Sequence, residues 1–412
     1  MHHNGKAVHV INSFHINECC LACGENQLSS VLDLGMQPLA NSYLTTADDD
    51  EPRYPLHMIR CNHCNHLQLS GSVDPQLLFA NYAYVAGTSR TLTDYSRWFV
   101  EHVSQYSMRM HNRILDIGCN DGTQLNCFAD AGWETYGVDP AENILRTTRI
   151  RHRVVQGFFP NVESEIFSLP YDIICAQNVL AHNHDPLSFL LACSNMMRQE
   201  TLLFVQTSQA DMVKNFEFDT IYHEHVNFFN TRSFMALCAR AGLRLLSVSK
   251  TPIHGGSYLF QIAKLGLPDA TVVCHLYDEQ QLHSPVTYEV YADHVKTNAK
   301  TLFSTVSKYR HQGYKLVGYG AAAKGNTLLN YTGIDLDFII DDSELKQGRF
   351  TPGRHIPIVA RNYIQSFERA HIAWLPLAWN FHDEIVSKIK ACRNTRDDVF
   401  IRYFPNVETI YV

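Results

Sequence analysis

The segment Ile114-Leu115-Asp116-Ile117-Gly118-Cys119-Asn120-Asp121-Gly122 decides the predicted fold of this chain. It begins with an apolar run of strand length, which ends at a turn holding two glycines. Glycine permits tight turns and lets a ligand approach the backbone closely. The segment lacks the GxGxxG pattern and the lysine of a P-loop, which disfavours dinucleotide and nucleoside-triphosphate sites. A purely structural strand-to-helix turn is the alternative interpretation.

Strand–helix alternation continues on the C-terminal side of this segment. Further strands are predicted at the runs 135–138, 173–176, 201–205, 244–248 and 257–263. The segments between them have helix length, which is typical of an open, mostly parallel α/β sheet. After a long helix-compatible stretch at 271–309, a second and smaller α/β unit is predicted around the runs 315–318, 338–341 and 372–375.

Polar side chains follow the first three predicted strands. Asp139 ends the second strand, where an acid suits hydrogen bonding to ribose hydroxyls. Asn178 and His182 follow the third strand, at the sheet edge where ligands bind. The strand, the glycine loop and the later acid together resemble a class I S-adenosylmethionine (SAM) methyltransferase, in which Asp116 would lie near the positively charged end of the cofactor. The expected cofactor contacts are Asp116, Gly118, Asn120, Gly122, Asp139 and Asn178.

The N-terminal region contains two paired cysteine motifs, Cys20-x-x-Cys23 and Cys61-x-x-Cys64. A CxxC turn gives two thiolates the spacing that a tetrahedral metal needs, and two such turns complete a closed structural zinc site. Four thiolates leave no open position for catalysis, so we expect these cysteines to bind a structural Zn²⁺. Two unrelated cysteine pairs, or a redox CxxC, are the alternatives.

The length and composition indicate a globular protein of two or three domains. The chain has 412 residues, 45% hydrophobic and 18% charged, with a formal net charge of −7. The acidic balance disfavours a nucleic-acid partner, and no apolar run reaches the length of a membrane span. No signal peptide is visible, so we expect a cytoplasmic protein. The predicted division is a zinc-binding module over 1–75, a SAM-dependent methyltransferase domain over 76–268 and a C-terminal Rossmann-like domain over 269–412.

The densest group of ionisable side chains is Tyr222-His223-Glu224-His225, which is flanked by aromatic residues. In an extended backbone, the first and third of these side chains would point to one side and the two histidines to the other. Histidine suits acid–base catalysis near neutral pH. Metal binding by His-x-His lacks an obvious third ligand, and a buried polar network without a catalytic role is the remaining interpretation.

A series of motifs in this order resembles the sugar-nucleotide C-methyltransferases of deoxysugar biosynthesis. The motifs are the two cysteine pairs, Met36-Gln37-Pro38-Leu39-Ala40-Asn41-Ser42, the loop at 116–122, Asn178-Val179-Leu180-Ala181-His182, Ile221-Tyr222-His223-Glu224-His225 and Gly318-Tyr319-Gly320-Ala321-Ala322-Ala323-Lys324-Gly325-Asn326-Thr327. The likeness covers nearly the whole chain. Members of this family contain zinc, use SAM and carry a C-terminal Rossmann-like domain. Where they often have Glu-Ile-Ala-Ser-Asn, this chain has Asp116-Ile117-Gly118-Cys119-Asn120, and the shorter carboxylate should still serve.

The resemblance implies methylation at C3′ of a nucleotide-linked 4-keto-6-deoxyhexose, with dTDP as the expected nucleotide. The keto group acidifies the C3′ proton, and a base then generates the carbon nucleophile. By hypothesis His225 removes this proton, Tyr222 hydrogen-bonds the keto or enolate oxygen, and Glu224 orients the histidine or binds the sugar. Tyr84 resembles a family active-site tyrosine that precedes the SAM domain. The expected substrate-binding residues are His182, His223, Lys324 and Asn326.

The C-terminal glycine motif predicts where the substrate diphosphate binds. Backbone amides after Gly318-x-Gly320 would hold it at a helix N-terminus, with Lys324 supplying charge; a turn that serves only packing is the alternative. Competing functions are O-methylation, C-methylation of a non-sugar ketone, and a zinc-stabilised protein that binds SAM or a sugar nucleotide without turnover. We expect a monomer or small homo-oligomer.

Overall fold

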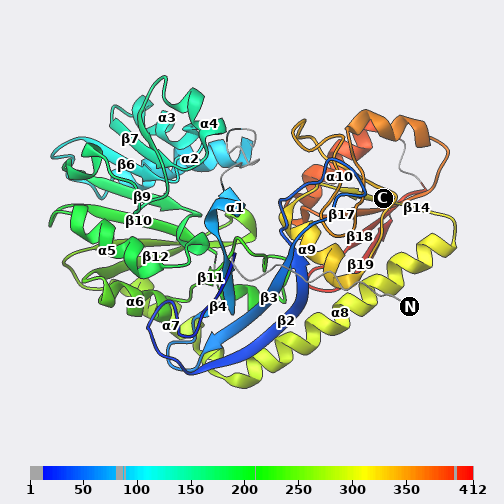
Figure 1. Ribbon diagram of the computed structural model, residues 1–412, viewed down its shortest axis with the longest axis horizontal. Helices are drawn as coiled ribbons and strands as arrows, with labels where there is room; N and C mark the ends of the chain where they lie inside the picture. The colour runs from blue at the N-terminus through cyan, green and yellow to red at the C-terminus, as the bar shows by residue number, and fades with distance from the viewer. Residues whose placement is uncertain (1–12, 80–86, 88–89, 209, 394–396, 412) are drawn as a thin grey trace, which may run out of the picture.

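The computed structural model describes residues 13–79, 87, 90–208, 210–393 and 397–411, whose strands form four sheets. Figure 1 shows two α/β lobes joined along one side by the strands β2 (Leu28–Pro38) and β3 (Arg53–Cys61) and by the long helix α8 (Pro285–His311). This arrangement confirms the predicted α/β fold with an N-terminal cysteine module and two Rossmann-like sheets.

The first lobe is built on a seven-stranded sheet in the order β12-β13-β10-β9-β6-β7-β8. Its strands are β6 (Arg113–Ile117), β7 (Glu134–Asp139), β8 (Arg153–Gln156), β9 (Ile173–Gln177), β10 (Leu202–Thr207), β12 (Arg244–Thr251) and β13 (Ser257–Ala263). Strands β6 to β10 are parallel, whereas β13 is antiparallel to both β10 and β12. Strand order reverses between β6 and β9, the switch point at which open α/β sheets bind ligands.

Helices connect the strands of this sheet. They are α2 (Arg90–Ser104), α3 (Thr123–Asp130), α4 (Glu142–Thr148), α5 (Pro186–Met196) and α6 (Thr231–Arg240). Helix α5 begins where Asp185 caps it by accepting the Ser188 N–H at 3.0 Å, with Pro186 in the first turn. Asn230 caps α6 in the same way through Ser233.

The N-terminal module contributes a two-stranded sheet, β1 (Phe14–Ile16) with β5 (Gly71–Val73), and a four-stranded sheet in the order β11-β4-β3-β2. Strand β4 (Leu67–Leu69) lies between β3 and β11 (Asn227–Phe228), and a short helix α1 (Pro75–Phe79) follows β5. Because β11 comes from the chain after β10, the N-terminal sheet is completed by a strand of the first lobe. Sequence patterning did not predict this pairing.

The second lobe has a six-stranded sheet in the order β16-β15-β14-β17-β18-β19. Its elements are β14 (Lys315–Tyr319), α9 (Ala323–Thr332), β15 (Phe338–Ile340), β16 (Ile358–Val359), β17 (Ile372–Pro376), α10 (His382–Cys392), β18 (Val399–Arg402) and β19 (Glu408–Tyr411). The helix-compatible stretch before it is not one helix: α7 (Ala270–Asp278) ends before a 3₁₀ turn, and α8 starts at Pro285. Proline at the first helical position lacks the N–H that a continuing helix needs.

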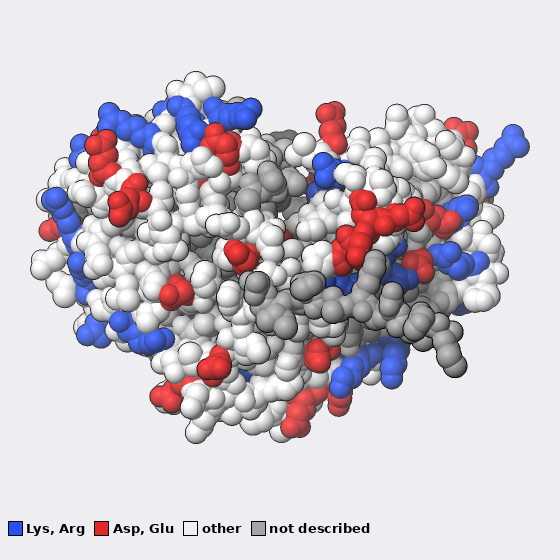
Figure 2. Space-filling view, in the orientation of Figure 1, with Lys and Arg blue, Asp and Glu red and all other residues white. Residues whose placement is uncertain are grey.

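Charged residues are interspersed on the face shown in Figure 2, where lysines and arginines lie mainly toward the periphery. None of the helices among the described residues combines the length and apolar character that crossing a membrane requires.

Candidate functional site

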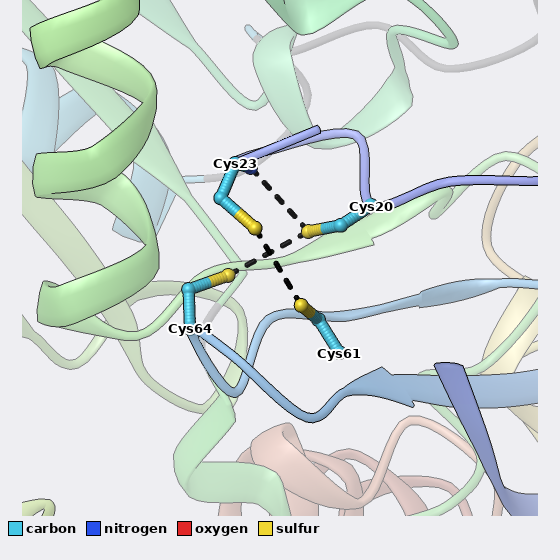
Figure 3. A group of neighbouring side chains, drawn as sticks. All are labelled: Cys20, Cys23, Cys61 and Cys64. Carbon is cyan, nitrogen blue, oxygen red and sulfur yellow. Dashed lines mark hydrogen bonds between the residues drawn. The ribbon is translucent and has the colours of Figure 1, made fainter. Parts of the chain in front are cut away.

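The four predicted zinc ligands converge on one point between the two CxxC turns (Figure 3). The ligand atoms of Cys20, Cys23, Cys61 and Cys64 all lie within 4.8 Å of one another. Cys20 Sγ is 3.5 Å from Cys64 Sγ, and Cys23 Sγ is 3.5 Å from Cys61 Sγ. Sulfurs held at about 2.3 Å from a tetrahedral zinc are roughly 3.8 Å apart, so the cluster fits a closed structural Zn²⁺ site and confirms that prediction.

The loop after β6 is shaped to bring backbone close to a ligand. Gly118 has φ 81° and Asn120 has φ 49°, both in the left-handed region. A Cβ atom at Gly118 would lie 2.3 Å from Val179 Cγ2, so a side chain does not fit there. Gly122, with φ 77°, precedes the first turn of α3 and does not itself line the cavity described below. Gly118 therefore allows a ligand to approach the backbone, whereas Gly122 allows the chain to enter helix α3.

Asp139 and Asp116 present carboxylates at the ends of adjacent strands. Asp139 accepts the N–H groups of Asn120 at 3.0 Å and Ala141 at 2.9 Å, which leaves further acceptor sites for two hydroxyls. Burial raises the pKa of Asp116 to about 7, against a weaker lowering by the Cys175 thiol 3.4 Å away. A positively charged ligand beside such a buried carboxyl group stabilises its ionised form. Both carboxylates thus fit the ribose and the charged end of SAM.

A cavity of about 1030 Å³ opens from this loop toward the second lobe. Single small-molecule pockets are typically about 300–1,000 Å³, so the volume suits a cofactor together with a second substrate. Its lining includes all the predicted cofactor residues except Gly122, and also contains His182, Tyr222, His225 and Lys324. The cavity therefore brings together side chains from both lobes.

The Tyr222–His225 segment is a turn, so the side-chain alternation of an extended backbone does not apply to it. The His225 N–H donates to Tyr222 O at 2.8 Å, which brings the two side chains to the same side. Tyr222 Oη lies 2.8 Å from His225 Nε2, and the rings are 4.1 Å apart. His225 Nδ1 is 2.9 Å from Thr220 O. Because a carbonyl only accepts, Nδ1 carries the hydrogen in the neutral ring, and Nε2 is the basic nitrogen facing Tyr222.

The other two members of the motif point away from the cavity. His223 is 2% exposed, its Nε2 is 3.3 Å from Tyr54 O, and burial lowers its pKa to about 4. The prediction that His223 binds substrate is therefore corrected: the turn directs it into the N-terminal module. Glu224 is 3% exposed, does not line the cavity, and accepts the Asn41 Nδ2–H at 2.6 Å.

His182 lies beside the Tyr222–His225 pair, with its ring 5.0 Å from that of His225 and 5.6 Å from that of Phe79. Burial lowers the pKa of His182 to about 4, so it is neutral near pH 7. A neutral neighbour does not oppose protonation of His225.

Of the two substrate-binding residues predicted in the second lobe, one lines the cavity and the other does not. Lys324 lies in the first turn of α9, lines the cavity and has Nζ 5.1 Å from the Trp379 ring centre. Asn326 is 1% exposed and donates from Nδ2 to Ala40 O at 2.7 Å. The prediction that Asn326 binds substrate is corrected, because its amide joins α9 to the N-terminal module. Tyr84 lies outside the described residues.

The second lobe repeats the loop-and-acid geometry of the first. Asn120 N donates to Asp139 Oδ2 at 3.0 Å, and Ala321 N donates to Asp341 Oδ2 at 2.7 Å. In the second lobe, however, Lys346 Nζ is 3.7 Å from that carboxylate and donates to Ala321 O at 2.8 Å. The acid that would face a ribose is paired with a lysine, so this lobe is not arranged as a second cofactor site.

Several cavity residues were missed by sequence analysis: Asn41, Glu217, Lys346, Tyr95 and Gln206. Asn41 belongs to a motif that carried the family resemblance but was given no role. Glu217 and Lys346 lie in segments without a recognisable pattern, and only the tertiary fold brings them to the cavity.

Three family models match consecutive parts of the chain. They are a putative zinc binding domain over residues 20–79, a methyltransferase domain over 91–248 and a C-methyltransferase C-terminal domain over 252–405. The first model covers the cysteine module and the second covers most of the seven-stranded sheet. The third begins at residue 252, so it takes in β13 of that sheet as well as most of the second lobe.

Individual relatives agree with these matches. C-methyltransferase NovU from Streptomyces niveus is 29% identical over 387 residues, which cover 90% of this chain and 92% of NovU. A ubiquinone biosynthesis O-methyltransferase from Aromatoleum aromaticum is 27% identical over 163 residues, covering 34% of this chain and 69% of that enzyme. Among solved structures, a SAM-dependent methyltransferase from Clostridium acetobutylicum covers 42% of this chain and 92% of its own at 12% identity and a TM-score of 0.35.

Proposed function

Because this chain belongs to the SAM-dependent C-methyltransferases that carry an N-terminal zinc-binding domain, we propose that it methylates C3′ of a nucleotide-linked 4-keto-6-deoxyhexose. The observation that carries this proposal is the Tyr222–His225 pair, hydrogen-bonded at 2.8 Å in the cavity that also contains the SAM loop. Carbon methylation requires a base, and this pair supplies one.

The pair divides the proton chemistry between its members. SAM supplies the electrophilic methyl group when it is bound. His225, whose Nδ1 is held by Thr220 O, takes the C3′ proton at Nε2. In the pair as it stands, the single Tyr222 hydroxyl hydrogen is donated to His225 Nε2, so the acceptor sugar must replace this hydrogen bond. The C3′–H then faces Nε2, and the Tyr222 hydroxyl donates to the 4-keto oxygen as negative charge develops there, which stabilises the enolate. The cavity has room for the cofactor together with the acceptor. Bound there, the two would react by in-line displacement of S-adenosylhomocysteine from the methyl carbon, with positioning as the main contribution of the protein.

The second lobe is proposed to bind the nucleotide diphosphate. Ala322, Ala323 and Lys324 line the cavity at the start of α9, where backbone N–H groups and the helix dipole favour anions. Burial raises the pKa of Glu217 to about 7 and that of Asp219 to about 6, while the Lys324 charge opposes both shifts. Glu217 is therefore only partly ionised near neutral pH, which limits its repulsion of a diphosphate, whereas Asp219 remains mostly ionised.

The test is isotope exchange combined with product mass. Wild-type protein is incubated in deuterated water with dTDP- and GDP-linked 4-keto-6-deoxyhexoses, without and then with SAM. We expect exchange of the C3′ hydrogen without SAM, a gain of one methyl group with SAM, and loss of both in His225→Ala. Exchange that persists in His225→Ala would exclude that residue as the base, and methylation without any exchange would favour an O-methyltransferase. Unchanged acceptor affinity in Lys324→Ala would count against the diphosphate site.

A further inference from the structure

The segment after β2 crosses from the N-terminal module to the second lobe and carries Asn41 past the cavity. It is anchored on both sides of that residue. Ala40 O accepts the Asn326 Nδ2–H at 2.7 Å, and Leu44 exchanges two backbone hydrogen bonds with Phe350, at 3.0 and 2.9 Å. Because both flanks are fixed to the second lobe, the position of Asn41 is set by tertiary structure.

The orientation of the Asn41 amide follows from its partners. Its Nδ2 donates to Glu224 Oε1 at 2.6 Å, and since a carboxylate only accepts, the amide nitrogen must face Glu224. Asn41 Oδ1 then faces away from the carboxylate. Tyr43 Oη is 3.4 Å from this oxygen but only 2.5 Å from Ala321 O, and a hydroxyl has one hydrogen to donate. Asn41 Oδ1 therefore keeps capacity to accept a hydrogen bond.

Asn41 also stands between Glu224 and the ligand space. Asn41 lines the cavity together with Tyr222 and His225, whereas the Glu224 side chain lies behind it and is not part of the lining. Resting on the proposed function, we propose that Asn41 binds the acceptor sugar by accepting a hydrogen bond from a ring hydroxyl or amino group. Glu224 is then a positioning residue that fixes the amide, and the site selects substrates that carry such a donor.

The test compares KM for the acceptor and for SAM in variants of this pair, using dTDP-4-keto-6-deoxyglucose as the probe. Asn41→Ala removes the acceptor atom, and we expect the acceptor KM to rise about tenfold, the effect of one lost hydrogen bond in a built site, with the SAM KM within about twofold. Asn41→Asp places two carboxylates in contact and should impair acceptor binding at least as much. The double variant Asn41→Asp with Glu224→Gln restores a donor–acceptor pair with reversed polarity, so it should recover most of the loss.

Substrate analogues identify the group that is bound. A deoxy or deamino analogue that lacks the recognised donor should have the same KM with wild type and with Asn41→Ala. An active wild type with an unchanged acceptor KM in Asn41→Ala would overturn the inference, as would a double variant no better than Asn41→Asp. A wild type that methylates no acceptor would refute the proposed function instead. Thermal unfolding of the double variant gives a readout that does not depend on activity. If Glu224→Gln does not restore the Tm lost in Asn41→Asp, the inferred orientation of the Asn41 amide toward Glu224 is wrong.

Discussion

The buried carboxyl group of Asp116 predicts that SAM binding depends on pH. Burial raises the pKa of Asp116 to about 7, so this side chain is largely protonated in slightly acidic solution. A cationic cofactor beside it favours the ionised form, and the bound state therefore has the lower pKa. Binding releases a proton, and affinity must increase as pH rises toward neutrality.

The size of the effect follows from the fraction of Asp116 that is ionised before binding. With a pKa of about 7, about one group in thirty is ionised at about pH 5.5 and about one in two at about pH 7. Affinity for SAM should therefore rise about fifteenfold over this interval, or roughly 1.6 kcal/mol. The amino group of SAM titrates at about pH 8, above the interval. Asp139 is expected to face the neutral ribose hydroxyls and therefore to contribute less.

Isothermal titration calorimetry at several pH values measures this dependence, and Asp116→Asn is the matched variant. The variant should bind SAM with nearly constant affinity across the interval, close to that of wild type at its acidic end. Proton release measured in buffers of different ionisation enthalpy gives a second readout. A wild-type affinity that does not change with pH, or a variant that keeps the full dependence, would refute the assignment of Asp116 to the charged end of the cofactor.

Three further predictions concern the loop, the metal and the domain contact. Gly118→Ala should weaken SAM binding at least about tenfold because its Cβ would meet Val179 Cγ2 at 2.3 Å. Gly132→Ala is the control, because Gly132 has φ 83° and a Cβ there would meet nothing within 4 Å. This variant should lower the free energy of unfolding by about 1–2 kcal/mol, the conformational cost of left-handed backbone, and leave the Kd for SAM unchanged. Cys61→Ser should reduce bound zinc, measured by plasma emission spectrometry, from about one ion per chain to near none. Asn326→Ala should lower the free energy of unfolding by about 1–2 kcal/mol in urea titrations. Because Ala40 loses its anchor beside Asn41, the acceptor KM should also rise, but less than in Asn41→Ala, whereas a larger rise than in Asn41→Ala would indicate that Asn326 itself binds substrate.

Local chemistry made the cofactor loop and the metal site predictable. Left-handed φ at Gly118 favours glycine, and tetrahedral coordination by thiolates favours paired cysteines, so both features are visible in the sequence. Strands β8, β16, β18 and β19 were not predicted, because runs of two to four residues carry too little periodicity to separate them from loops.

Tertiary contacts explain the errors at the candidate site. The sequence left the backbone conformation of Tyr222 to His225 open, because alternation follows only if the segment is extended. A turn closed by a 2.8 Å hydrogen bond instead brings together the first and last members of the motif. His223 and Asn326 were expected to bind substrate because they belong to the motifs that carry the family resemblance. Their hydrogen-bond partners, Tyr54 and Ala40, lie in the N-terminal module. The residues that neighbour His223 and Asn326 in the sequence do not predict such long-range contacts.

The same contacts change the role expected of the zinc module. Strand β4 begins shortly after Cys64, and β11 begins two residues after His225; the two strands pair directly, with Gln68 opposite Asn227. The turn residue Asn65 is tied to the same region by the Asn230 Nδ2–H, 2.7 Å from Asn65 O. A zinc ion that fixes the second CxxC turn therefore also fixes the exit of the turn that holds Tyr222 and His225. Four thiolates leave the metal no open coordination position, yet its loss should displace His225, the proposed base, through β4 and β11, and Asn41 through β2.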